Sequence, residues 1–142
     1  MDKPIAGYGW FIKRIDNALE KEANQHLQTL NLTMQQNRVL ILLAHAEAHI
    51  MSLKALEEHF GAAQSTVAGL VARLEKKGLI EAVASPADRR IKLVHLTDEG
   101  IRVHAQSRQN VLDSEARLTA NLTAEEKDAF LICLKKVYET VK

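Results

Sequence analysis

The stretch that decides the fold is residues 64–100, which read "QSTVAGLVARLEKKGLIEAVASPADRRIKLVHLTDEG". Its first half places apolar residues three or four positions apart, which predicts a helix from Gln64 to Lys77. The side chains expected on its inward face are Val67, Leu70, Val71 and Leu74. Gly78 follows, at the position where a glycine commonly ends a helix.

The second half of the stretch predicts a β-hairpin. Residues 79–84 and 91–96 are rich in β-branched side chains, which is typical of short strands. Between them, Ser85–Asp88 fits a type I turn, because its second residue is a proline with the φ that this turn needs. Arg89 and Arg90 follow, and exposed charges of this kind add little to stability. We therefore expect them to serve a purpose other than folding.

Upstream of this stretch the sequence predicts three helices. An apolar stripe predicts the first, from about Ala6 to Leu30. The stripe consists of Phe11, Ile15, Leu19, Ala23, Leu27 and Leu30. Thr33 and Gln36 form a capping box that starts the second helix. Ser52 caps the third, and Gly61 ends it.

Downstream, two more helices are predicted. One starts at Thr97 and extends to about Ala120. Its apolar stripe is Ile101, Ala105, Val111, Leu112 and Leu118. The last helix starts at a second capping box, Thr123 with Glu126. Its stripe is Phe130, Leu134, Val137 and Val141. The expected fold is therefore mainly α, with a small β-hairpin.

Composition narrows the class of protein. The chain has 142 residues, of which 46% are hydrophobic and 26% charged, as in a single globular domain. No apolar run approaches the roughly 18 residues of a membrane span, and the N-terminus lacks a signal-peptide pattern. Its single cysteine cannot form an internal disulfide, so we expect a cytoplasmic protein.

The charge distribution is uneven. Residues 61–96 carry six basic and three acidic side chains, whereas the net charge of the whole chain is only +1. A local basic patch on a neutral protein indicates a surface for a polyanion. The alternative interpretation is a solvated charged face.

Two short helices around a glycine turn, followed by a hairpin, form a winged helix-turn-helix, whose second helix lies in the DNA major groove. The contacts expected from that helix are Gln64, Ser65, Thr66 and Arg73. A hairpin tip extends beyond the body of such a fold, and narrow minor grooves attract arginine. Arg89 and Arg90 are therefore predicted to contact DNA from this hairpin, or wing.

The quoted stretch resembles the core signature of MarR-type transcriptional regulators, and the Asp-x-Arg wing followed by "LT-x-x-G" is its specific part. The resemblance implies a DNA-binding lobe at about residues 33–96, flanked by dimerisation helices at 1–32 and 97–142. It implies that Asp88 braces Arg90, which enters the minor groove. It also implies a homodimeric repressor, often released by a small aromatic or anionic effector. Its two-fold symmetry would match a pseudo-palindromic operator.

Four positions depart from the common pattern of these regulators. Ala63 stands where a capping serine is usual, and Gly69 where arginine is frequent. Ala82 and Ala84 replace frequent basic residues of the first wing strand. The last three changes remove phosphate contacts and favour an alternative, a winged-helix protein–protein adaptor with weak or no DNA binding, whereas the two wing arginines disfavour this alternative.

Other candidate sites have simpler interpretations. Cys133 is interpreted as a buried structural thiol rather than a redox sensor. His45 and His49 are four residues apart, which would place them on one helix face as solvated residues. A metal would need a third ligand, such as His104. Trp10 is expected to pack in the dimer interface, with ligand contact as the alternative.

No catalytic motif is found. The sequence has no phosphate-cradling glycine loop, no Cys-x-x-Cys and no recognisable Ser/His/Asp signature. The sequence therefore predicts neither an enzyme nor a metal or cofactor site.

Overall fold

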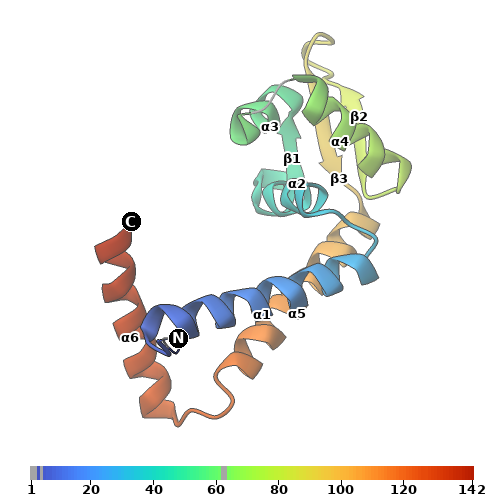
Figure 1. The fold of residues 1–142 in the computed structure, drawn as a ribbon. Helices are drawn as coiled ribbons and strands as arrows, with labels where there is room; N and C mark the ends of the chain where they lie inside the picture. The colour runs from blue at the N-terminus through green and yellow to red at the C-terminus, as the bar shows by residue number, and fades with distance from the viewer. Residues whose placement is uncertain (1–2, 4, 62–63) are drawn as a thin grey trace. The chain divides into compact units, whose positions relative to one another are not determined.

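The computed structural model of the chain describes residue 3 and residues 5–61 and 64–142, and Figure 1 shows the fold. Its elements are α1 (Tyr8–Thr29), α2 (Met34–His45), the 3-10 turn η1 (Glu47–His49), β1 (Ile50–Ser52), α3 (Leu53–Phe60), α4 (Gln64–Lys76), β2 (Ile80–Ala84), β3 (Lys92–Leu96), α5 (Asp98–Leu118) and α6 (Ala124–Val141). They divide into two compact units, Met1–Asn110 and Val111–Lys142. The predicted helical architecture with a small β wing is confirmed.

The helices start and end where local side chains satisfy free backbone groups. Thr33 Oγ1 accepts from the Gln36 N–H at 3.1 Å, and Gln36 Oε1 accepts from the Thr33 N–H at 3.2 Å. Ser52 Oγ caps α3 by accepting from the Ala55 N–H at 3.1 Å. Gly61 ends α3 with a φ of 57°, in the left-handed region that favours glycine. These predicted caps are confirmed.

The sheet has one strand more than the sequence predicted. The strand order is β1-β3-β2, and both pairs are antiparallel. Val94 of the central strand pairs with Met51 on one side and with Ala82 on the other. The sequence did not predict β1, because this strand has only three residues and pairs with β3, which begins 40 residues after β1 ends.

The hydrophobic core lies in the first unit. Its buried members are Leu27, Leu32, Val39, Leu40, Leu43, Leu56, Val67, Leu70, Val71, Leu74, Leu79, Ile80, Val94, Leu96 and Val103. They come from α1, α2, α3, α4, the sheet and the start of α5, so one core fixes α4 against the sheet. The inward face predicted for α4 is confirmed.

The apolar stripe predicted for α5 does not face the core of the first unit. Its expected stripe is exposed, with Ile101 at 39% and Val111 at 60%. The buried residues of α5 are instead Gly100, Val103 and Ser107. The start of α5 fixes the rotation of the helix about its axis, because the N–H of Thr97, just before the helix, donates to Leu79 O at 3.1 Å.

The apolar stripes of the other long helices are also largely uncovered. In α1 only Leu27 is buried, and Phe11 is 53% exposed. Residues 111–142 are all described, and none of them is buried. The predicted stripe of α6 is exposed along its length. The large exposed apolar residues of the second unit are Val111, Leu112, Leu118, Phe130, Leu131, Ile132, Leu134, Val137, Tyr138 and Val141.

Candidate nucleic-acid interface

Helix α4 turns its polar side outward. Its valines and leucines are buried, while Thr66 and Arg73 are exposed. A Cβ on Gly69 would lie 3.7 Å from Arg73 Nη1, so the guanidinium of Arg73 lies back over the glycine. The structure therefore places Thr66 and Arg73 on the accessible side of the helix. The side chains of Gln64 and Ser65 lie outside the described part of the chain, as does Ala63, where the missing cap was predicted.

The far end of α4 is held by a lysine that the sequence analysis did not single out. Lys77 donates through Nζ to Gln36 Oε1 at 2.8 Å and to the backbone oxygen of Asn31. Gln36 is 4% exposed and also completes the capping box of α2. These contacts fix the C-terminal end of α4 against the junction of α1 and α2. This contact could not be predicted from the sequence, because a lysine at the end of a helix does not indicate which distant residue it binds.

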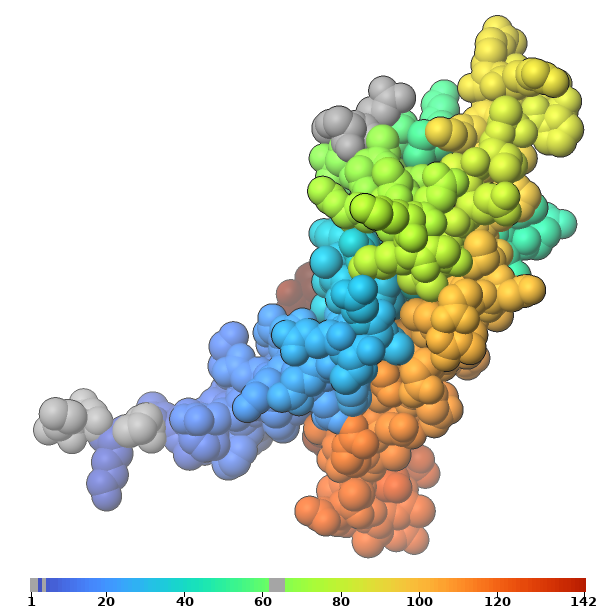
Figure 2. All heavy atoms as spheres, turned by 90° about the vertical axis from the view of Figure 1, so that its right-hand side faces the viewer, coloured from blue at the N-terminus to red at the C-terminus, as the bar shows by residue number. Residues whose placement is uncertain are grey.

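The wing is the hairpin formed by β2, β3 and the loop that connects them. The Ser85 N–H donates to Ile91 O at 2.8 Å and extends the β2–β3 pairing by one step. The hydrogen-bonded turn lies later than predicted, because it is the Ile91 N–H that donates to Asp88 O, at 2.9 Å. The turn therefore places Arg89 and Arg90 at its two central positions, rather than after it. Figure 2 shows this loop, in yellow, projecting beyond the rest of the lobe.

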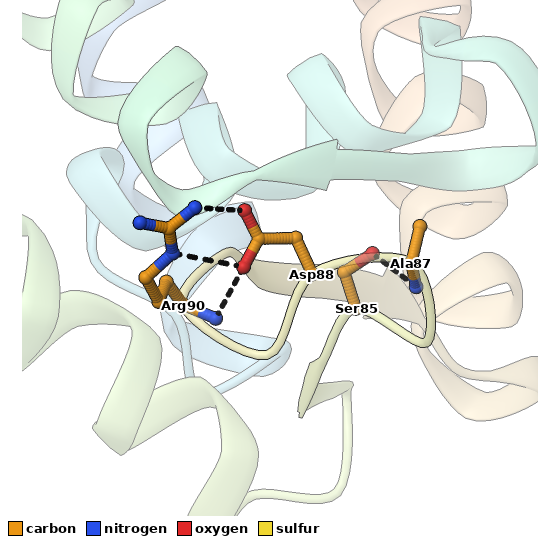
Figure 3. Close-up of polar contacts among 4 residues, drawn as sticks. All are labelled: Ser85, Ala87, Asp88 and Arg90. Carbon is orange, nitrogen blue, oxygen red and sulfur yellow. Dashed lines mark hydrogen bonds and ion pairs between the residues drawn. The ribbon is translucent and has the colours of Figure 1, made fainter.

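Asp88 and Arg90 form a two-point contact within the wing (Figure 3). Arg90 Nε donates to Asp88 Oδ1 at 3.1 Å and Arg90 Nη2 donates to Asp88 Oδ2 at 3.1 Å. The Arg90 N–H also donates to Asp88 Oδ1, at 3.0 Å. The side-chain contact with Arg90, followed by the backbone contact, holds the pKa of Asp88 below its ordinary value of 3.8. Asp88 therefore stays ionised at neutral pH and limits the rotamers of an arginine whose side chain is 91% exposed.

The first wing strand is bound to α4 at one of the positions where a basic side chain is missing. β2 is an edge strand, and the Ala82 N–H donates to Glu75 Oε2 of α4 at 2.8 Å. This bond satisfies an edge N–H and ties the wing to α4. Ala84 is exposed, so neither alanine offers a charge to a polyanion. The positive charge of the wing comes from Arg89, Arg90 and Lys92.

The histidine pair is not arranged as predicted. Helix α2 ends at His45, and Ala48 has a φ of 55°, so His45 and His49 do not share a helix face. The ring of His45 instead meets that of His104 with centroids 6.0 Å apart. Burial, then the nearby His45, Arg108 and His49, lower the pKa of His104. In the described residues, no group of three or more His, Cys, Asp or Glu side chains is placed to hold a metal.

Two other expectations concern single residues. Cys133 is exposed on α6, so the prediction of a buried thiol is wrong for the isolated chain. Cys133 is exposed because no other element of the second unit covers the apolar side of α6. Trp10 is 37% exposed and packs edge-to-face on Phe11, with Arg14 over its ring at 4.6 Å. Across the described residues, the helices are all too short or too polar to cross a membrane.

Known proteins resemble the chain in both sequence and fold. The profile of the MarR family matches residues 30–91. The multiple antibiotic resistance protein MarR of Escherichia coli (strain K12) is 33% identical over 136 residues, covering 94% of this chain and 92% of that protein. The crystal structure of wild-type apo MarR from E. coli aligns with a TM-score of 0.71 at 30% identity, covering 95% of this chain and 98% of that one. The S. aureus MepR–DNA complex gives a TM-score of 0.84 at 23% identity, covering 95% and 100%, and shows the same fold.

Proposed function

The chain belongs to the MarR family of transcriptional regulators, which are not enzymes, and on that premise we propose that it represses transcription as a homodimer on double-stranded DNA. MepR, a protein of the same fold, was crystallised as a complex with DNA. Here α4 would occupy the major groove and the wing would reach the neighbouring minor groove. Release by a small aromatic or anionic effector stays a prediction from the resemblance.

One observation carries this proposal. Helix α4 (green) and the projecting wing (yellow) both lie on the face of the lobe that is turned towards the viewer in Figure 2. Thr66 and Arg73 are exposed on the helix, and Arg89 and Arg90 are exposed on the wing. Exposed pairs such as Asp88–Arg90 stabilise proteins little, so a contact with DNA is the better reason for fixing this arginine.

The uncovered apolar helices support a dimer. The chain exposes an apolar stripe on α6 and apolar residues on α1 and α5. Exposed apolar patches of this extent mark interaction surfaces. We propose that a second copy of the chain covers them, as the dimerisation helices at residues 1–32 and 97–142. A two-fold dimer would bind half-sites about 10–10.5 base pairs apart, or a multiple of that.

A salt titration on genomic DNA fragments tests the function. Wild-type affinity should fall steeply with salt, because bound lysines and arginines release counterions from phosphates. If Arg73 contacts a phosphate, replacing it by Ala should lower the affinity for all sequences. If Arg73 contacts guanine, the replacement should instead lower the discrimination at one base pair by about 1–3 kcal/mol. Absence of DNA binding would favour the adaptor, which Gly69, Ala82 and Ala84 support. If the protein does bind, sequencing the retained fragments would define the operator.

A further inference from the structure

A groove of about 560 Å³ separates the start of α3 from the wing. Ser52, Lys54 and Glu57 line one side, and Arg90 and Lys92 line the other. The pairing of β1 with β3 forms this groove, because Ser52 lies opposite Leu93 in the sheet. The groove therefore joins residues about 40 positions apart in the sequence.

The groove has an excess of positive charge. Lys54, Arg90 and Lys92 contribute three positive charges and Glu57 one negative charge. The nearest acid of the wing, Asp88, is already engaged by Arg90. In the described part of the chain, neither lysine forms an ion pair, so both charges are available to a ligand.

The groove also has hydrogen-bond donors that the fold leaves unused. Asp88 engages Nε and Nη2 of Arg90, while Nη1 points away from the carboxylate (Figure 3). Ser52 Oγ accepts from the Ala55 N–H, which leaves its own hydroxyl proton to be donated. Guanidinium, ammonium and hydroxyl donors together form the set that binds phosphate oxygens.

We propose that this groove binds one backbone phosphate of DNA beside the minor groove that receives the wing. The proposal rests on the proposed function and extends it to Lys54 and Lys92, which would position the wing without reading sequence. The occupant is a phosphodiester because the groove is continuous with Arg90, the residue expected to enter the minor groove. A free phosphate anion would use the same hydrogen-bond donors, and the experiment below distinguishes it from a DNA phosphate.

The experiment compares salt titrations of four variants on one DNA duplex that the wild type binds. Lys54→Ala and Lys92→Ala should each weaken binding on all sequences, and the slope of log affinity against log salt should fall by about 0.9 per subunit. Lys21→Ala removes the same charge from α1 and should leave the slope unchanged. Glu57→Gln removes the only acid of the groove and should strengthen binding. Melting temperatures should match the wild type, since these side chains are on the surface.

The outcomes separate this proposal from the proposed function. A wild type that does not bind DNA would overturn both. A wild type that binds DNA, with Lys54→Ala and Lys92→Ala indistinguishable from Lys21→Ala, would overturn only the phosphate groove. Inorganic phosphate should weaken wild-type binding more than chloride at equal ionic strength, and Lys54→Ala should lose this difference, because free phosphate and the DNA phosphate would compete for the groove. Inorganic phosphate that binds the wild type but not Lys54→Ala, while Lys54→Ala binds DNA as the wild type does, would assign the groove to small anions and overturn the DNA contact.

Discussion

Ser107 Oγ donates to Asn37 Oδ1 across 3.2 Å, in a buried hydrogen bond that joins α5 to α2. The two residues are 8% and 9% exposed and are separated by 70 positions of sequence. Both belong to the first compact unit, so this bond fixes how α5 leaves the lobe. Because this hydrogen bond needs Ser107 to face Asn37, it fixes the rotation of α5 about its own axis. Apolar contacts alone would allow a wider range of rotations.

Replacing Ser107 by Ala should lower the free energy of unfolding by about 1–3 kcal/mol, because Asn37 Oδ1 would remain buried without its donor. Urea denaturation at fixed protein concentration measures the change. Ser114→Ala, farther along α5, is the matched control and should stay within about 0.5 kcal/mol. Equal stabilities of the two variants would show that the buried bond contributes nothing.

Two glycines in helices should respond oppositely to alanine. A Cβ on Gly100 would lie 2.1 Å from Leu79 O and 2.6 Å from Leu96 Cδ1. Gly100→Ala should therefore destabilise the fold by about 1–3 kcal/mol or more, despite alanine's better helix propensity. On Gly69 the nearest atom is Arg73 Nη1 at 3.7 Å, so Gly69→Ala should stabilise by about 0.5–1 kcal/mol. Thermal unfolding of both variants checks this, and stabilisation of both would refute the packing argument.

The local cap at Thr97 shows why part of the fold was predictable. The "LT-x-x-G" stretch is a junction: Thr97 Oγ1 accepts from the Gly100 N–H at 3.0 Å and donates to Gly78 O at 2.7 Å. Caps of this kind depend on neighbouring residues, so the sequence reveals them. The inward face of α4 was predictable for a similar reason, since periodicity alone defines it.

Features set by distant contacts could not be predicted in the same way. The rotation of α5 depends on where Gly100 meets Leu79, and its predicted stripe is exposed in the single chain. The groove at Lys54 and Lys92 depends on the pairing of β1, a strand too short to show a pattern. Helix α2 ends where Ala46 becomes extended, and Ala48 in the turn that follows is left-handed; no local rule for alanine would predict either conformation.

Stability should decrease as the pH falls from neutral into the acidic range, with His104 as one cause. Burial and the positive surroundings of His45, Arg108 and His49 lower its folded pKa below the ordinary value of 6.5. Between that folded pKa and 6.5 the unfolded state binds more protons, so acidification favours unfolding in this window. His104→Gln should flatten this part of the profile, as measured by urea unfolding at several pH values. A variant with the wild-type slope would exclude His104 as the cause.

The oligomeric state should depend on the apolar side of α6. Leu134 is 41% exposed in the stripe that would face a second copy of the chain. Leu134→Glu should shift the mass in solution towards the 15.9 kDa of one chain, because the dimer would bury an unpaired charge. Lys136→Glu, on another face of the helix, should leave the mass at twice that value. A wild type that is monomeric at micromolar concentration would overturn the dimer proposal.

The wing arginine should matter for DNA and not for folding. Arg90→Ala should weaken binding most on operators with A·T-rich flanks, because narrow minor grooves are strongly negative and attract arginine. Asp88→Ala should weaken binding less, since the arginine remains but loses the two-point contact that limits its rotamers. Both melting temperatures should stay near that of the wild type, because the pair is on the surface.

The measurement combines DNA affinity on duplexes with A·T-rich and G·C-rich flanks with the melting temperature of each variant. The pH can be held at 7, well above the ordinary pKa of 3.8 of Asp88, which the contact with Arg90 lowers further. Unchanged affinity of Arg90→Ala on both duplexes would show that the wing does not contact DNA. An equal loss on both would assign Arg90 to a phosphate rather than to the minor groove, since phosphate contacts act uniformly across sequences.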